Sequence, residues 1–138
     1  MKKILIDSDI CLDVITGRVL FEKESAMILQ YSEDNVINGL VSAESFSNMY
    51  YVLRKLSSSE KAIRQLTNLR RIVNVGEITK AVIDQALSSG WRDFEDAIQY
   101  FCALESDCDA IVTRNRYDFR FSGLPVYNPT ELIRIVNS

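Results

Sequence analysis

Short apolar runs alternate with longer stretches of helical periodicity along the whole chain. The runs contain β-branched residues and end at polar positions, which is typical of buried strands. They lie at residues 4–6, 36–41, 72–75, 110–112 and 124–127. Between them, apolar side chains recur every three or four residues, which predicts helices. These helical stretches lie at residues 12–19, 22–31, 43–56, 60–71, 78–87, 94–104 and from 129 onward.

The alternation of strands and helices predicts an α/β fold. We expect one domain over residues 1–138, a three-layer α/β/α sandwich with a central, mainly parallel sheet. The chain of 138 residues has an ordinary composition for such a domain, 47% hydrophobic and 25% charged. Pro125 places the last short strand at an edge of the sheet, where a missing N–H is tolerated.

The composition excludes several kinds of chemistry. The sequence has no histidine, so triads and zinc sites that need imidazole are ruled out. Its three cysteines, Cys11, Cys102 and Cys108, lie in or beside apolar runs and are expected to be small buried residues. No apolar stretch approaches the roughly 20 residues of a membrane span. We therefore expect a cytoplasmic protein without a membrane anchor, whose chemistry depends on carboxylates, hydroxyls, thiols, amines or a metal held by oxygen.

Acidic residues gather where the predicted strands end and the predicted helices begin. In a parallel sheet the carboxyl ends of the strands meet at one edge, where ligands bind. The residues concerned are Asp7, Asp9, Glu44, Asp93, Asp96 and Asp118. Structural roles are open for most of them: Asp93 is placed to cap a helix that has an acid three residues on, and Asp13 is expected to be a solvated helix residue.

Several carboxylates in one cleft repel one another. A pair roughly 5 Å apart costs about 3 kcal/mol at an effective dielectric constant of 20. A hard divalent cation such as Mg²⁺ or Mn²⁺ reverses this balance, because it prefers oxygen ligands and readily takes phosphate as a further ligand. Such an ion also lowers the pKa of bound water, which supplies a nucleophile without histidine. The pattern therefore indicates phosphodiester hydrolysis.

Four segments resemble the motifs of PIN domains, in order and over essentially the whole chain. They are ILIDSDI at residues 4–10, VSAE at 41–44, DFEDA at 93–97 and IVTRNRYDF at 111–119. Asp9 stands where asparagine is usual in the family. The nearest likeness is to the VapC-like toxins of bacterial toxin–antitoxin pairs.

The resemblance implies an Mg²⁺- or Mn²⁺-dependent ribonuclease, the toxin of a toxin–antitoxin pair. It carries Asp7, Glu44, Asp96 and Asp118 over as the catalytic, metal-binding acids. Ser8, Asp9, Asp93, Thr113 and Asn115 become residues that orient the site or its water. It further suggests a homodimer and an antitoxin segment bound along the helices at residues 43–71.

The formal net charge of −3 is unfavourable for a protein that binds RNA, so the distribution of charge matters. Arg114, Arg116 and Arg120 are interleaved with Tyr117, Phe119 and Phe121 after the fourth strand. This cluster is predicted to grip a splayed single strand by stacking and charge. The alternative is that the phenylalanines pack beneath the loop while the arginines are solvated.

Two other functions fit parts of the sequence. A haloacid-dehalogenase-type phosphatase would use Asp7 and Asp9 after the first strand, but position 11 is Cys11 and no lysine follows Lys80. A metal- or protein-binding module without turnover would need the same acids. A nucleotide-cofactor enzyme is disfavoured, because no glycine-rich loop follows the first strand.

Overall fold

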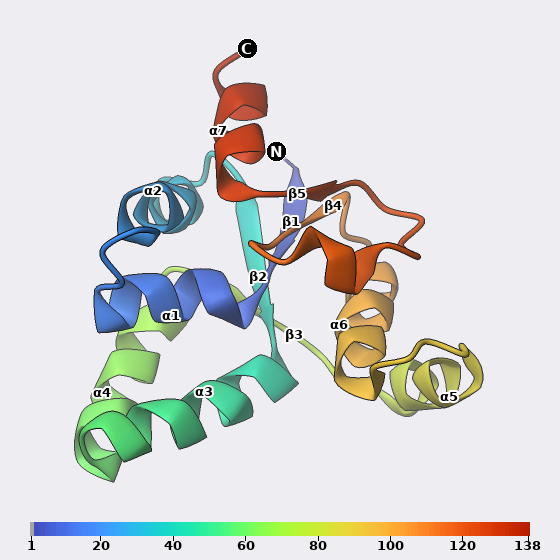
Figure 1. Cartoon of the computed structure of the whole chain (residues 1–138), viewed down its shortest axis with the longest axis horizontal. Coiled ribbons are helices and arrows are strands. Elements are labelled where there is room, and N and C mark those ends of the chain that lie inside the picture. The colour runs from blue at the N-terminus through green and yellow to red at the C-terminus, as the bar shows by residue number, and fades with distance from the viewer. Residues whose placement is uncertain (1) are drawn as a thin grey trace.

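The computed structural model describes residues 2–138 and contains a five-stranded sheet with helices on both faces (Figure 1). The strands are β1 (Lys3–Ile6), β2 (Asn38–Ser42), β3 (Asn74–Gly76), β4 (Ala110–Val112) and β5 (Val126–Tyr127). The helices are α1 (Ser8–Thr16), α2 (Glu22–Glu33), α3 (Ala43–Leu56), α4 (Ser59–Arg70), α5 (Lys80–Ser88), α6 (Phe94–Glu105) and α7 (Pro129–Val136), with a 3₁₀ turn, η1 (Arg116–Phe119).

All the strand pairs are parallel, in the order β3-β2-β1-β4-β5. The central strand β1 therefore lies between β2 and β4. Strands β2 and β3 are added on one side of β1, and after β3 the chain crosses back to add β4 and β5 on the other side. Ligands of open parallel sheets bind beside such a reversal, at the carboxyl ends of the strands. This edge is where the sequence places the acidic residues.

Two separate cores hold the three layers together. On one face of the sheet, Ile4 and Ile6 pack with buried residues of α1, α2, α3, α4 and α7. On the other face, Leu5 and Ile111 pack with α5, α6 and the turn η1, where Phe119 is fully buried. The alternation of β1 side chains between the two cores follows the two-residue period of a strand. The predicted α/β/α sandwich is confirmed.

Several predicted boundaries differ from the structure. Helix α1 ends at Thr16, because Gly17 adopts a left-handed conformation with φ of 67° and caps the helix. Val19, which matched the helical spacing, lies beyond this cap and is 91% exposed. The second, third and fifth strands are shifted or shorter than predicted, since residues 36–37, 72–73 and 124–125 lie outside the ladder. The boundaries of α3 and β4 are as predicted.

Short polar side chains begin most of the helices. Ser42 accepts a hydrogen bond from the Ser45 N–H at the start of α3, as predicted. Asn128 and Glu131 form a reciprocal capping box at the start of α7. The three cysteines are buried and unpaired, as expected. Within residues 2–138, no helix combines the length and apolarity needed to cross a membrane.

Candidate active site

Asp7 lies at the carboxyl end of the central strand and caps the helix that follows. The sheet register pairs Ile6 with Val112, and the Asp7 N–H donates to the Val112 carbonyl at 3.0 Å, which places Asp7 next to Thr113. One carboxylate oxygen, Oδ1, accepts from the Ser8 N–H at 2.7 Å. The other, Oδ2, accepts from the Thr113 hydroxyl at 2.8 Å. Ser8 and Thr113 thus fix the orientation of the carboxylate.

The Thr113 hydroxyl is itself oriented by its neighbours. The side chain is fully buried, and its Oγ1 accepts a hydrogen bond from the Asn115 N–H at 3.0 Å. Its single proton therefore points to the acids, where Asp7 Oδ2 at 2.8 Å is a closer acceptor than Asp9 Oδ2 at 3.4 Å. The predicted orienting residue thus contacts the predicted metal-binding acid directly.

Asp9 connects the first turn of α1 to the loop after β4. Its Oδ2 accepts from the Arg114 N–H at 3.1 Å and from the Asn115 side-chain amide at 3.2 Å. Its Oδ1 is buried and has no hydrogen-bond partner. Burial and then the charge of Asp7 raise the pKa of Asp9 to about 7, against opposing hydrogen bonds from the loop. This carboxylate is only half satisfied by the protein.

Asp96 and Asp118 face Asp7 from α6 and η1. Asp93 caps α6 and accepts from the Asp96 N–H at 3.0 Å, which is the capping role expected of Asp93. Partial burial, with the charges of Asp93, Asp118 and Glu95, raises the pKa of Asp96 to about 6. The pKa of Asp7 is likewise raised, mainly by burial and further by the charges of Asp96 and Asp118. These three acids therefore share one electrostatic environment.

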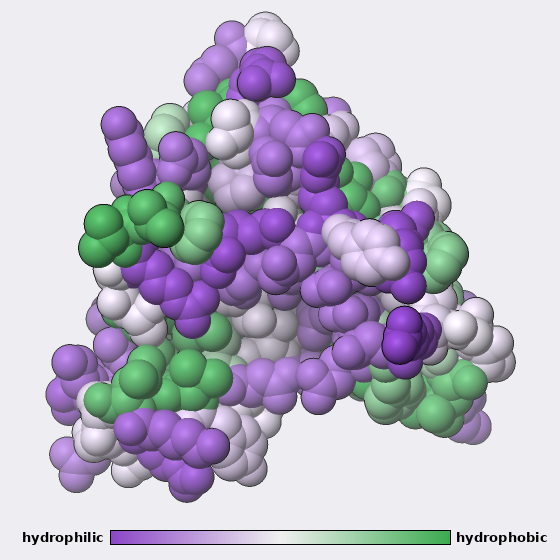
Figure 2. Space-filling model, viewed as in Figure 1, coloured by the Kyte–Doolittle hydropathy of each residue, from purple (hydrophilic) through white to green (hydrophobic). Residues whose placement is uncertain are grey.

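Glu44 belongs to the same acidic edge but has different nearest charges. Its pKa is raised by partial burial and by Glu95 and Asp93, while a hydrogen bond from Asn48 opposes the shift. The first turns of α3 and α6, which carry these acids, approach each other beyond the sheet (Figure 1). Figure 2 shows hydrophilic side chains in this region, between helices α3 and α4 on one side and helices α5 and α6 on the other. Glu95 was missed in the sequence because it directly adjoins Asp96.

A buried polar chain fixes the two helices that carry Glu44 and Asp96. Ser45 donates its hydroxyl to Gln99 Oε1 at 3.3 Å and its N–H to Ser42 Oγ at 3.0 Å. Ser42, Ser45 and Gln99 are all buried. Because buried polar groups are costly to leave unpaired, this chain of hydrogen bonds ties the start of α3 to α6.

The three arginines of the predicted RNA-binding cluster occupy different environments. Arg114 directs its guanidinium to the buried Asp13, so its charge is already paired within the protein. Arg116 pairs with Glu131 at 3.0 Å and stays half exposed. Arg120 lies over the rings of Tyr117 and Phe121. Of the aromatic residues, Phe119 packs beneath the loop, whereas Tyr117 and Phe121 are exposed.

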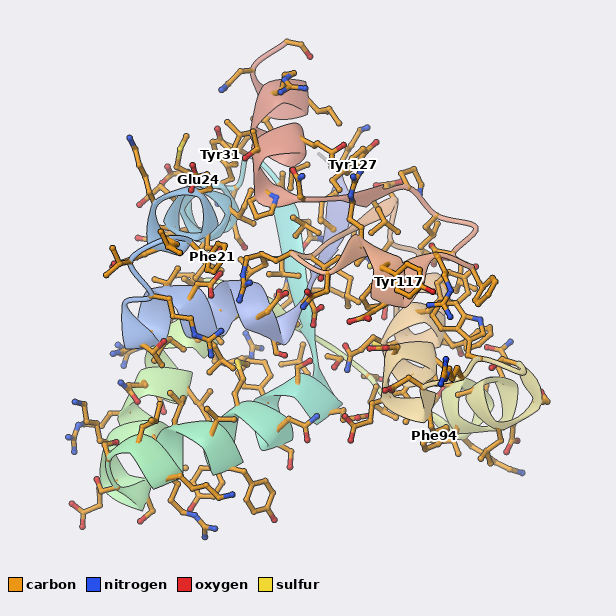
Figure 3. The ribbon with its side chains drawn as sticks, viewed as in Figure 1. Phe21, Glu24, Tyr31, Phe94, Tyr117 and Tyr127 are labelled. Atoms are coloured by element: carbon orange, nitrogen blue, oxygen red, sulfur yellow. The ribbon has the colours of Figure 1, made fainter. Side chains whose placement is uncertain are left out.

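Asp13 is the clearest difference from the sequence interpretation. It is fully buried rather than solvated and accepts from Arg114 and from the Ser25 hydroxyl. Arg114 also stacks on Phe21, with its Cζ 4.0 Å from the ring centroid, at the turn between α1 and α2 (Figure 3). No local pattern in the sequence indicates that Asp13 and Arg114 form a pair.

The donor set of this edge fits a hard divalent cation. Its acids offer oxygen ligands. Burial, and then the charges of neighbouring acids, raise the pKa values of Asp7 and Asp96, and a cation would offset that repulsion. The unpartnered buried Oδ1 of Asp9 is a further oxygen without a proton donor. Across residues 2–138, no three Cys, Asp or Glu side chains are grouped tightly enough to hold a metal ion as they stand. The fit therefore rests on the donor chemistry and the electrostatics.

The chain belongs to the PIN domain family, which matches residues 3–117. It is 24% identical over 123 residues to Ribonuclease VapC1 of Aquifex aeolicus (strain VF5), and the match covers 83% of each protein. This agrees with the resemblance drawn from the four sequence motifs.

Solved structures with the same fold include toxin–antitoxin proteins. DNA-bound VapBC from Salmonella typhimurium has a TM-score of 0.73 at 14% identity, covering 94% of this chain and 99% of that one. VapBC2 from Rickettsia felis, bound to a fragment of its promoter, has a TM-score of 0.70 at 14% identity, with coverages of 91% and 98%. VapC20 of Mycobacterium tuberculosis, a Sarcin-Ricin loop cleaving toxin, has a TM-score of 0.61 at 15% identity, with coverages of 78% and 86%. These likenesses show the fold.

Proposed function

We propose that this protein is a metal-dependent endoribonuclease, the toxin of a toxin–antitoxin pair. The observation that carries the proposal is the placement of Asp7 at the carboxyl end of β1, within the electrostatic reach of Asp96 and Asp118. The similarity to a VapC ribonuclease supports RNA as the substrate. Mg²⁺ or Mn²⁺ is the proposed cofactor, held by Asp7, Glu44, Asp96 and Asp118.

When bound, such a cation lowers the pKa of water and offsets the charge of the scissile phosphate. The chain's own residues hold the acids in position for this. Thr113 and the Ser8 N–H fix the two oxygens of Asp7. Asp93 orders the first turn of α6 and thereby places Asp96. Asp9 ties the loop that leads to Asp118 back onto α1.

A cleavage assay tests the proposal. Single-stranded RNA is incubated with the purified protein in Mg²⁺, in Mn²⁺ and in chelator, alongside Asp7→Asn and the control Asp84→Asn, an exposed acid on α5. We expect cleavage only with a metal ion, and its loss in Asp7→Asn but not in Asp84→Asn. Intact RNA in every wild-type reaction would contradict the proposal. Phosphate release from small phosphoesters alone would indicate a phosphatase instead.

An antitoxin and a second copy of the chain are the proposed protein partners. Helices α3 and α4 leave large apolar side chains exposed, with Tyr51 at 55%, Leu56 at 66% and Ile63 at 55%. A groove of about 510 Å³ beside Ile63 runs between these helices. Light scattering is expected to give a dimer that Leu56→Glu or Ile63→Glu weakens. An unchanged monomer at high concentration would contradict a homodimer.

A further inference from the structure

A cleft of about 360 Å³ joins the acidic site to a group of aromatic and cationic side chains. Asp96 and Asp118 line it on the acidic side. The rest of its lining includes Trp91, Arg92, Tyr117, Arg120 and Phe121. The cleft forms because η1 packs against α6.

The aromatic side of the cleft exposes two rings that the fold nevertheless holds in place. Tyr117 is 73% exposed and Phe121 is 64% exposed, whereas Phe119 between them is buried and anchors the turn. The Arg120 guanidinium lies over both rings, with Cζ 4.1 Å from the Tyr117 centroid and 4.7 Å from that of Phe121. Its Nη1 also donates to the Tyr117 carbonyl at 3.0 Å. Tyr117 projects from η1 above α6 (Figure 3).

Trp91 extends this aromatic surface toward the protein interior. It stacks on Tyr100, with ring centroids 4.9 Å apart, and meets Phe121 edge-on at 6.3 Å. Because Tyr100 is buried and also accepts the Gly123 N–H, this inner part of the surface is rigid. Because these side chains are already held in place, little of their conformational entropy would be lost when a planar ligand stacks on them.

The positive charge available at this cleft comes from two arginines. Arg114 and Arg116 are each paired with a carboxylate elsewhere. Arg92 and Arg120 line the cleft, and neither forms a salt bridge in the part of the chain that the structure describes. Proteins bind single-stranded nucleic acids with exposed aromatic rings, on which bases stack, and with positively charged side chains beside those rings.

We propose that this cleft is a nucleobase-binding subsite, which stacks an unpaired base of the RNA next to the cleaved phosphate. The inference rests on the proposed function and adds to it a contact between these rings and one unpaired base of the RNA. A base in a duplex has neighbours on both of its faces, so neither face is free to stack on Tyr117 or Phe121. Without a metal ion the negative acids nearby disfavour phosphate, so in chelator the base itself must supply much of the attraction.

Fluorescence of Trp91, the one tryptophan of the sequence, provides a binding measurement without catalysis. Wild-type protein in chelator is titrated with a short single-stranded RNA, with an abasic strand of equal length and charge, and with duplex RNA. We expect quenching with the single strand, and affinities at least about tenfold weaker for the abasic strand and for the duplex. Equal affinities for the base-bearing and abasic strands would overturn the proposal.

Variants of one exposed tyrosine make the test specific. Tyr117→Ala is expected to weaken single-strand binding by about tenfold, while Tyr117→Phe retains it. Leu20→Ala is the control, because Leu20 is also a large side chain that is 82% exposed, but it lies in the turn between α1 and α2. Unchanged binding in a folded Tyr117→Ala protein would overturn the proposal.

The outcomes separate this proposal from the proposed function. Cleavage of RNA with unaltered binding in Tyr117→Ala would reject only the subsite. Binding that depends on Tyr117 and on the base, without cleavage in any metal ion, would reject only the ribonuclease. Both measurements use the intact wild-type chain as their reference.

Discussion

Asp13 and Arg114 form a buried, two-point ion pair between α1 and the loop that follows β4. Arg114 Nε lies 2.8 Å from Asp13 Oδ2, and Nη2 lies 3.0 Å from Oδ1. The Arg114 N–H donates at the same time to Asp9. One residue thus connects a fully buried carboxylate to a half-satisfied one at the candidate active site. The pair therefore links the stability of the fold to the position of the loop that carries Asp118.

Removal of Arg114 is expected to destabilise the protein strongly. Arg114→Ala leaves the Asp13 carboxylate buried without its principal cation and should lower the free energy of unfolding by about 3 kcal/mol. Arg114→Lys keeps the charge but loses the two-point geometry, so its effect should be intermediate. Chemical denaturation measures both variants.

The control for this prediction is Arg18→Ala. Arg18 reaches the same Asp13 at 3.4 Å with 43% of its side chain exposed, so its loss should cost less than about 1 kcal/mol. Equal destabilisation by Arg18→Ala and Arg114→Ala would contradict the assignment of Arg114 as the principal partner.

Stability of the protein in chelator is expected to fall as the pH rises from about 4 to about 7. The pKa of Asp9 is raised from 3.8 to about 7 in the fold, so the folded state holds this proton more tightly than the unfolded chain. That stabilisation is complete below the unfolded pKa and is lost as the pH passes the folded pKa. Asp96, with its pKa raised to about 6, acts in the same direction.

Thermal unfolding across this pH range measures the effect. Asp9→Asn should flatten the dependence, because the amide carries no titrating proton, whereas the exposed control Asp84→Asn should leave it unchanged. Stability that rises with pH over this window would show that Asp9 is not held in an unfavourable charged state.

Thr113→Val tests the orientation of Asp7. Valine has nearly the same shape as threonine but cannot donate to Asp7 Oδ2, so the carboxylate loses its 2.8 Å hydrogen bond. We expect RNA cleavage to fall about 10- to 100-fold, as for other residues that orient a metal-binding side chain. Thr113→Ser restores the hydroxyl and should recover most of the rate. Full activity of Thr113→Val would rule out this role.

Gly39→Ala tests the packing of β2 against α2. A Cβ at position 39 would lie 2.5 Å from Ser32 Oγ and 2.8 Å from Ile6 Cδ1, inside the core. The backbone or these neighbours must shift, which should cost about 1–3 kcal/mol of stability. Gly123→Ala, whose nearest new contact is the Tyr100 hydroxyl at 3.1 Å, should cost less. Equal unfolding midpoints for both variants would contradict the close packing at Gly39.

The sequence predicts the sandwich well because the relevant signals are local. Apolar strands at residues 4–6 and 110–112 are recognisable by composition, and a serine or aspartate before a helix identifies Ser42 and Asp93 as caps. Parallel strands then bring their carboxyl ends together, which is why Asp7 and Asp118 could be assigned to one edge. Thr113 was assigned to the site by the resemblance to the PIN-domain motif. Val19 was misplaced because the left-handed turn at Gly17 ends the helix before the apolar period does.

Side-chain partners are the part that the sequence does not predict. Asp13 matches a solvated helix position by spacing, and only the fold brings Arg114, 101 residues away, into contact with it. The same applies to Glu95, whose charge acts on Glu44 across two helices. Long-range pairs of this kind depend on how the layers pack, which no local pattern encodes.

RNA cleavage by this protein is proposed to depend on a divalent cation held by the acids at the carboxyl end of the sheet. The most direct test is the rate of single-stranded RNA cleavage as a function of Mn²⁺ concentration, for wild-type protein, Asp96→Asn and Asp84→Asn. We predict a saturable rise from zero for the wild type and Asp84→Asn, and no rise for Asp96→Asn. A wild-type rate that persists in chelator, or an Asp96→Asn rate equal to that of the wild type, would contradict the account.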